Sequence, residues 1–254
     1  MYSNIFDTHA HYDDEKFDGD RAEVLSLVKN SGVCTIIDCG CDLKSSLAAV
    51  KLSEDFDFIF AAVGVHPHEA EEATEVDFSE IRRLYEKKKV VAVGEIGLDY
   101  HYDFSPREKQ KEVFERQLIL ANELNLPVIV HDREAHEDTL MLLKKYKPKG
   151  VVHCFSGSTE GAREILSLGM YIGLGGAVTF KNARKPLEVA AFVPEDRLLL
   201  ETDCPYMAPV PFRGKRCDSS MIPFSAERIA EVRKTDVQTL IDRCCKNAQT
   251  LFGI

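Results

Sequence analysis

The sequence has no run of apolar residues long enough to cross a bilayer, for which a helix needs about 20 residues. The first residues, MYSNIFDTHAH, contain neither the basic stretch nor the apolar stretch of a secretory signal peptide. Linkers, low-complexity tracts and short internal repeats are missing as well. We therefore expect a cytoplasmic protein that does not associate with membranes.

Basic residues are also scarce, because 32 Lys and Arg stand against 42 Asp and Glu and give a formal net charge of −10. Proteins that wrap long duplex DNA neutralise many phosphates with lysine and arginine, so this composition argues against that class. It does not argue against an enzyme that holds the end of a nucleic acid strand locally through metal ions.

Cysteine is present, but the spacing of a zinc cluster is lacking. The chain has 8 cysteines, and the closest pair with a turn-like spacing, Cys39 and Cys41, has no second pair at zinc-finger distance. In a reducing compartment, free thiols are the expected state. We expect ordinary buried or surface thiols.

The dominant pattern is a short apolar, β-branched run followed by a longer amphipathic segment. The clearest amphipathic segment covers residues 109–125. The runs predict strands over residues 5–11, 33–40, 58–66, 90–99, 127–132, 150–155, 171–175 and 198–203. Because the first strand is not followed by a glycine-rich dinucleotide loop, an open doubly wound sheet is disfavoured. The 254 residues instead match one α/β domain, a (β/α)8 TIM-type barrel over residues 1–254.

Side chains able to bind metal stand at the predicted strand ends. They are His9, His11, Glu95, His131, His153 and Asp203. The carboxyl ends of barrel strands converge on one face, so these side chains are expected to meet there. His9 and His11 are two residues apart, which on a strand puts both imidazoles on one face. A single histidine at a strand end is more often structural, but polar groups in this number are costly unless they are coordinated.

Several motifs carry a family resemblance. FDTHAH, GVHPH, GEIGLDY, PVIVHDR, HCFSG and ETDCPY followed by PFRGKR occur in this order between Asp7 and Arg216. Together they resemble the TatD family of metal-dependent deoxyribonucleases in the amidohydrolase superfamily. The resemblance implies a hydrolase that cleaves DNA from an end, with two divalent cations per chain (Mg, Mn or Zn). The net charge of −10 favours single strands or frayed ends as the substrate.

The resemblance also implies the division of the ligands. His9, His11, Glu95 and Asp203 would hold one cation, and Glu95, His131 and His153 the other, with Glu95 bridging the two. A water activated by the cations would attack phosphorus, and the residues proposed as catalytic are Glu95 and Asp203, the latter as general base. Asp7 is either a partner of a ligand or a buried structural carboxylate.

Two further residues are expected to bind substrate. His66, in GVHPH, is favoured over His68 for a phosphate contact by the resemblance. Arg213 follows the eighth strand, where this fold usually binds phosphate, although a solvated basic surface is the alternative. After RGKR, relatives usually have Asn-Glu-Pro, whereas this chain has Cys-Asp-Ser-Ser at 217–220, near the expected substrate mouth. That departure leaves substrate preference open.

Two other functions compete with the deoxyribonuclease. The first is hydrolysis of an ester or amide bond, such as that of a D-aminoacyl-tRNA deacylase, because the same metal-activated water can attack carbon. The second is a metal-binding module without catalysis, against which the complete ligand set argues.

Overall fold

The computed structural model describes residues 2–254 as eight strands and nine α-helices, with five short 3-10 helices in the connections between them. The strands are β1 (Ile5–Ala10), β2 (Val33–Cys39), β3 (Ile59–Val63), β4 (Val90–Asp99), β5 (Val128–Arg133), β6 (Gly150–Val152), β7 (Tyr171–Leu174) and β8 (Leu198–Leu200). The helices are α1 (Arg21–Asn30), α2 (Leu43–Asp55), α3 (Glu75–Leu84), α4 (Arg107–Leu124), α5 (His136–Tyr146), α6 (Thr159–Ser167), α7 (Arg184–Phe192), α8 (Ile222–Arg233) and α9 (Val237–Phe252).

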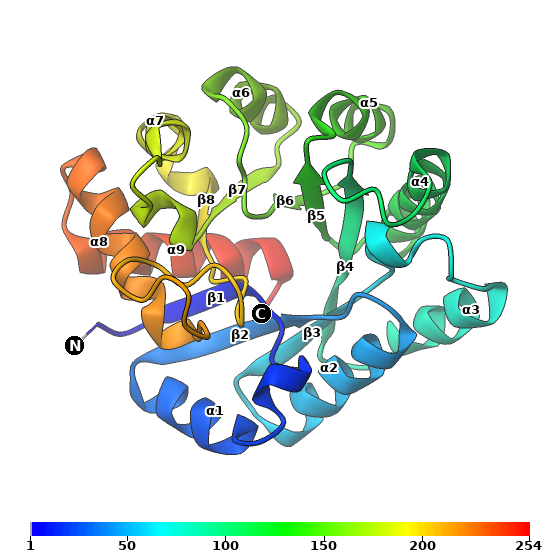
Figure 1. Ribbon diagram of the computed structural model, residues 1–254, viewed down its shortest axis with the longest axis horizontal. Helices are drawn as coiled ribbons and strands as arrows, with labels where there is room; N and C mark the ends of the chain where they lie inside the picture. The colour runs from blue at the N-terminus through cyan, green and yellow to red at the C-terminus, as the bar shows by residue number, and fades with distance from the viewer. Residues whose placement is uncertain (1) are drawn as a thin grey trace.

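The strands form one parallel sheet in chain order, β1 to β8, and the helices lie around it (Figure 1). A parallel bridge between Ala10 and Cys204 joins the region after β8 to β1 and brings the ends of the sheet together. The predicted (β/α)8 barrel is confirmed. No helix within residues 2–254 has the length and apolar character needed to cross a membrane.

The strands β1, β2 and β7 end one residue earlier than predicted, whereas β3, β6 and β8 are shorter by three residues or more. Their predicted last residues, which include His153 and Asp203, belong to the loops at the carboxyl ends. The chain turns sharply there, because Cys154 has φ 42° and Asp203 has φ 64°, a left-handed conformation that is unfavourable for residues other than glycine. The pattern of apolar residues cannot reveal this turn.

The helix α9 closes the amino-terminal end of the barrel. Side chains from every strand form a buried cluster that also includes Cys245, Ala248 and Phe252 of α9. In Figure 1, α9 runs beside β1 and β8. The Phe252 ring stacks on Phe6 of β1 with 6.1 Å between ring centroids. Because one end of the barrel is filled with apolar side chains, the opposite end is left for chemistry.

Strand alternation carries the predicted site residues into the barrel mouth. Ile129 and Val151 belong to the interior cluster, and His131 and His153 follow them by two residues each. The pairing of β1 shifts register between Asp7 and Ala10, and the pairing of β4 shifts between Val93 and Ile96. Such irregularities change the direction of a side chain, and His9 and Glu95 lie within these two intervals.

Asp7 links β1 to the segment after β8. Its Oδ1 accepts hydrogen bonds from the backbone N–H groups of His9 and Thr202, at 3.3 and 3.0 Å. Its Oδ2 accepts from the hydroxyls of Thr202 and Ser219, each at 2.6 Å. Burial raises the pKa of Asp7 to about 6, although these hydrogen bonds oppose the rise. Asp7 therefore bonds the backbone beside His9 and no imidazole, which favours the structural alternative.

The segment 217–220 does not lie at the substrate mouth as expected. Cys217 and Ser219 are buried, and the Ser219 hydroxyl also lies 2.8 Å from the hydroxyl of buried Tyr12. The departure from Asn-Glu-Pro therefore affects the closure of the barrel, because Ser219 supplies a hydrogen bond to Asp7. Within residues 2–254 the cysteines are free thiols, as predicted.

Truncation of Phe252 tests the role of α9. Phe252→Ala removes a ring that is 6% exposed and leaves a cavity at the closed end of the barrel. We expect a loss of about 3 kcal/mol of unfolding free energy and a Tm lower by about 6–12 °C. Thermal unfolding followed by circular dichroism measures this. Leu27→Ala, at a side chain that is 68% exposed, is the control and should change stability by less than about 0.5 kcal/mol.

Removal of the Ser219 hydroxyl tests the function of the atypical segment. Ser219→Ala leaves the buried carboxylate of Asp7 with one hydrogen bond fewer, so we expect unfolding free energy to fall by about 1–3 kcal/mol in a denaturant titration. The control is Ser220→Ala, whose hydroxyl bonds only Asp218 in the same turn. A changed substrate preference with unchanged stability would contradict the structural role.

Candidate metal centre

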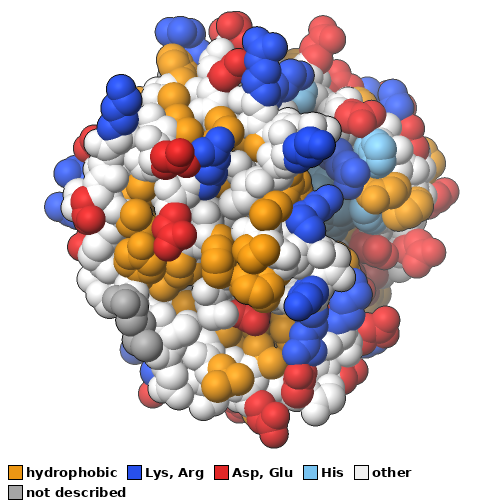
Figure 2. Space-filling view, turned by 60° about the vertical axis from the view of Figure 1, so that its left-hand side comes forward, with side chains coloured by type: hydrophobic (Ala, Val, Ile, Leu, Met, Phe, Trp, Pro, Cys, Tyr) orange, Lys and Arg blue, Asp and Glu red, His pale blue; other side chains and the backbone are white. Residues whose placement is uncertain are grey.

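The predicted site residues, apart from Arg213, meet at one cavity at the carboxyl ends of the strands. The cavity has a volume of about 820 Å³. Of the residues predicted from strand ends, those lining it are His11, Glu95, His131, His153, Asp203 and His66. His9 is fully buried beneath them. Figure 2 shows histidine side chains inside a hollow of the surface, with Lys and Arg on one side and Asp and Glu on the other.

Glu95 lies between two groups of histidines, and each of its carboxylate oxygens faces a different group. Oε1 lies 2.7 Å from Nε2 of His153 and 2.8 Å from Nδ1 of His131. Oε2 lies 3.3 Å from Nε2 of His9 and 3.4 Å from Nε2 of His11. The two oxygens therefore belong to two adjacent sets of donor atoms that share one carboxylate.

Asp203 completes the set around the β1 histidines. Its Oδ1 lies 3.6 Å from Nε2 of His9 and 3.5 Å from Nε2 of His11. The backbone fixes this position, because the N–H of Asp203 donates to the carbonyl of His9 at 3.0 Å. The Asp203 side chain is 21% exposed, whereas that of Glu95 is 4% exposed. One carboxylate of the cluster thus remains accessible from the cavity.

The spacing of these atoms fits divalent cations. Bonds of about 2.0–2.2 Å to nitrogen and oxygen bring neighbouring ligand atoms to about 2.9–3.6 Å from one another. Nε2 of His9 lies 3.0 Å from Nε2 of His11. Only one of two facing imidazole nitrogens can donate a hydrogen bond to the other, whereas a cation between them would accept both lone pairs. The buried Nδ1 atoms of His9 and His153 have no hydrogen-bond partner within residues 2–254, although Nδ1 of His153 lies 3.8 Å from Oε1 of Glu201.

The charges of the cluster stabilise one another. Burial raises the pKa of Glu95, but the neighbouring imidazoles, that of His153 first, outweigh burial and hold this pKa well below its usual value. The pKa of Asp203 is lowered because its contacts with His11 and His9 outweigh burial. Burial, followed by the charge of His153, lowers the pKa of His9 to about 4. Ionised carboxylates and a neutral His9 are the forms in which these groups bind a metal.

Asp99, the last residue of β4, contacts both His131 of the cluster and His68. Oδ2 of Asp99 lies 3.0 Å from Nε2 of His131, whose Nδ1 faces Glu95. The same oxygen lies 3.0 Å from Nε2 of His68. A carboxylate that accepts from one imidazole nitrogen orients the other nitrogen toward a ligand site. Asp99 therefore determines the orientation of the His131 ring.

The two predicted substrate residues have different positions. His66 lies against the cluster, with Nε2 3.5 Å from Oε1 of Glu95. Arg213 is exposed and does not line the cavity; its guanidinium carbon lies 3.8 Å from the centroid of the Phe180 ring. Arg216, of the same RGKR motif, is bound to Asp20 at 2.6 and 2.8 Å. The motif thus divides into an exposed arginine and an arginine held in an ion pair.

The sequence prediction missed residues that approach the cluster from loops and neighbouring strands. Cys41 was expected to be an ordinary thiol, yet its Sγ lies 3.9 Å from Oε2 of Glu95 and 4.0 Å from Nδ1 of His11. Arg133 lines the cavity two residues after His131. Arg133 lies in β5 two residues after the predicted site residue His131, so alternation was the available signal. Cys41 lies in the loop after β2, where strand alternation gives no signal.

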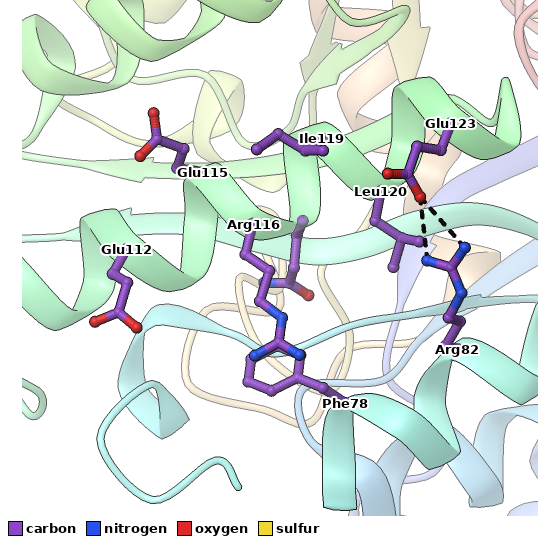
Figure 3. Close-up of a pocket in the computed structure, with 9 residues that line it drawn as sticks. Phe78, Arg82, Glu112, Glu115, Arg116, Ile119, Leu120 and Glu123 are labelled. Atoms are coloured by element: carbon purple, nitrogen blue, oxygen red, sulfur yellow. Dashed lines mark hydrogen bonds and ion pairs between the residues drawn. The ribbon is translucent and has the colours of Figure 1, made fainter. Parts of the chain in front are cut away.

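A second groove lies on the outside of the barrel between α3 and α4, with a volume of about 380 Å³ (Figure 3). It shares no lining residue with the metal-centre cavity. Its arginines are occupied: the Arg116 guanidinium lies 3.9 Å from the Phe78 ring centroid, and Arg82 pairs with Glu123 at 3.2 Å. These contacts join two helices and offer no convergent chemical groups.

Comparisons with known proteins agree with the motifs. A family model described as TatD related DNase matches residues 6–253. YabD of Bacillus subtilis, named an uncharacterized metal-dependent hydrolase, is 46% identical and aligns over 98% of this chain and 99% of its own length. A protein of Pantoea ananatis named 3'-5' ssDNA/RNA exonuclease TatD is 36% identical, over 98% of this chain and 100% of its own.

A solved structure agrees as well. The crystal structure of YJJV, a TatD homologue from Escherichia coli K12, superposes with a TM-score of 0.94 at 34% identity and covers 100% of both chains. The barrel, the order of the motifs and the full-length matches point to the same relatives. The chain belongs to the family of TatD-related DNases, metal-dependent hydrolases that include proteins named as exonucleases.

Proposed function

We propose that the chain is a metal-dependent exonuclease that hydrolyses phosphodiester bonds at the 3' end of single-stranded nucleic acid. The observation that carries the proposal is the position of Glu95, whose two carboxylate oxygens face two separate groups of imidazoles. A carboxylate in this position can bridge two cations, as two-metal hydrolases require. The polarity follows the name of the relative from Pantoea ananatis.

The donor atoms divide into two sets around Glu95. The first would consist of His9, His11, Glu95 and Asp203, and the second of Glu95, His131 and His153. Imidazoles combined with carboxylates suit zinc or manganese, and magnesium where the substrate phosphate supplies further oxygens. When bound, the two cations would lower the pKa of a coordinated water toward neutrality and offset the negative charge that develops on the phosphate oxygens.

Asp203 and Glu95 are the residues proposed to act in the reaction. Asp203 combines a lowered pKa with an exposed fraction of 21%, so its ionised carboxylate faces the cavity and can accept a proton from the attacking water. Glu95 is fixed by His131 and His153 and keeps the distance between the donor sets constant. His66, which approaches the same carboxylate at 3.5 Å, is positioned to hold a phosphate oxygen.

Single-stranded substrate is favoured by the charge around the site. The net charge is −10, and the cavity is lined by acidic side chains including Asp13, Asp14, Glu15, Asp42 and Glu69. Such a surface repels the dense phosphates of a duplex, whereas one strand end can enter and reach the cations. A deacylase is less favoured, because the named activities of the relatives are those of nucleases.

Metal removal and replacement of the Glu95 carboxylate test the proposed metal ligands. With a 3'-labelled single-stranded oligonucleotide, a chelator should abolish cleavage, and added Mg or Mn should restore it. Glu95→Gln should lower kcat by a factor on the order of 10³ or more, because the amide supports charge poorly. Metal analysis by mass spectrometry should show fewer than two ions per chain in this variant.

The matched control is Glu69→Gln, a cavity-lining carboxylate whose side chain forms no hydrogen bond or ion pair with the proposed metal ligands within residues 2–254. It should retain both the metals and kcat. Cleavage by chelated protein, or two ions and normal kcat in Glu95→Gln, would rule out the bridging role. A duplex with blunt ends should be degraded more slowly than the same strand alone; equal rates would contradict the preference for single strands.

Arg213 is proposed to contact a phosphate farther along the strand, because it is exposed outside the cavity lining. Arg213→Ala should raise KM for an oligonucleotide of about ten residues and leave kcat and metal content unchanged, as expected for lost uniform binding. A dinucleotide too short to reach Arg213 should show no change. Loss of metal in this variant would mean that Arg213 is part of the scaffold instead.

A further inference from the structure

Two exposed aromatic rings lie at the rim of the metal-centre cavity, in the loop after β4. Tyr102 is 47% exposed and Phe104 is 64% exposed. Their rings are stacked, with 5.1 Å between centroids and 16° between planes. Tyr102 lines the cavity itself. Because exposed aromatic rings gain little for folding, the pair offers a flat apolar surface beside the reacting groups.

This aromatic pair is held in a fixed position relative to the donor atoms. The backbone N–H of Tyr102 donates to Oδ1 of Asp99 at 2.9 Å. The His68 ring packs edge-on against both aromatic rings, with centroids 5.5 Å from Tyr102 and 4.8 Å from Phe104. Oδ2 of Asp99 contacts both His68 and His131 at 3.0 Å. One carboxylate thus ties the rings to a proposed metal ligand.

The positively charged side chain of Arg133 lies at the same rim of the cavity. The guanidinium carbon of Arg133 lies 4.6 Å from the centroid of the Tyr102 ring. Within residues 2–254 Arg133 has no ion-pair partner, although acidic side chains line the cavity. Lys44 is the other Lys or Arg that lines the cavity. The unpaired guanidinium therefore remains available to a phosphate, which it can bind with two parallel hydrogen bonds.

The opposite rim provides a useful contrast. Tyr206 is 47% exposed and also lines the cavity. However, Nζ of Lys16 lies 3.9 Å from the centroid of its ring, and its hydroxyl bonds Asp14 at 2.8 Å. The Tyr206 ring is thus covered by Lys16. The Tyr102 ring lies between Arg133 and Phe104, so the open aromatic face of the pair belongs to Phe104.

We propose that Tyr102 and Phe104 form a stacking surface for the nucleobase next to the scissile phosphate, and that Arg133 holds a phosphate oxygen of the same strand. The inference rests on the proposed function and specifies which residues of that site bind the base and the phosphate of its substrate. Every base has a flat π face, so stacking here favours a nucleotide that carries a base without distinguishing among bases. Stacking also requires an unpaired base, which agrees with a single-stranded end.

Abasic oligonucleotides test the stacking surface. One single-stranded DNA carries normal 3'-terminal nucleotides, and a matched one carries abasic residues at the last two positions. Fluorescence anisotropy with metal-loaded protein and strands whose 3'-terminal linkages resist hydrolysis measures binding without turnover, and kcat/KM with ordinary linkages measures cleavage. The wild type should prefer the normal strand by about tenfold in both measurements. Phe104→Leu and Tyr102→Leu should remove most of this preference by weakening only the normal strand.

Tyr206→Leu is the matched control and should keep the preference for bases, because its ring is covered by Lys16. Two results would overturn the stacking assignment: an unchanged preference in Phe104→Leu and Tyr102→Leu, or an equal loss in Tyr206→Leu. Failure of the wild-type metalloprotein to cleave any oligonucleotide would instead refute the proposed exonuclease, and the inference with it. Thermal unfolding verifies that each variant is folded.

Arg133 is tested separately through its charge. Arg133→Gln should weaken the normal and abasic strands equally, by about tenfold, and should lower the slope of log affinity against log salt by about one. The control is Arg82→Gln, at an exposed arginine of the outer groove that pairs with Glu123, which should change neither quantity. A loss confined to the normal strand, or an unchanged salt slope, would contradict a phosphate contact.

Discussion

The buried carboxylate of Glu95 is the group on which the rest of the site depends. At 4% exposure it has little contact with water, so its charge has to be balanced by protein groups or cations. The imidazoles of His9, His11, His131 and His153 lie within 3.4 Å of its oxygens. His9 and His11 belong to β1 and the residue just after it, His131 lies in β5 and His153 follows β6, and they meet only because the sheet is rolled into a barrel.

The arrangement around Glu95 requires supports that do not touch it. Asp7 accepts hydrogen bonds from backbone and hydroxyl groups at 2.6–3.3 Å and joins the strand of His9 to the segment before Asp203. Asp99 holds the ring of His131. The backbone at Asp203 adopts a positive φ of 64°, which persists because these neighbours determine it. Packing at the closed end of the barrel supplies stability that such a polar mouth cannot provide.

The sequence was sufficient to predict the barrel and the strand-end cluster, because alternation and the His-x-His spacing follow directly from strand geometry. Residues that act through contacts distant in sequence were not predictable. The ring of Tyr102 meets Arg133 and His68 only after β3, β4 and β5 are assembled. The segment 217–220 was expected near the substrate mouth, but the hydroxyl of Ser219 points inward and donates to Asp7.

The acidic side chains at the entrance of the cavity are compatible with cations bound at Glu95 and the histidines below them. Carboxylates that line the entrance would exclude phosphate from an empty site, since like charges repel strongly where little water intervenes. Cations held between Glu95 and the histidines would reverse that potential locally, so substrate affinity would depend on prior metal binding. Away from the cations the cavity remains acidic, and a phosphate chain can approach only where Arg133, Lys44 or a metal offsets its charge. A flexible strand end satisfies this constraint, whereas a rigid duplex presents many phosphates at once.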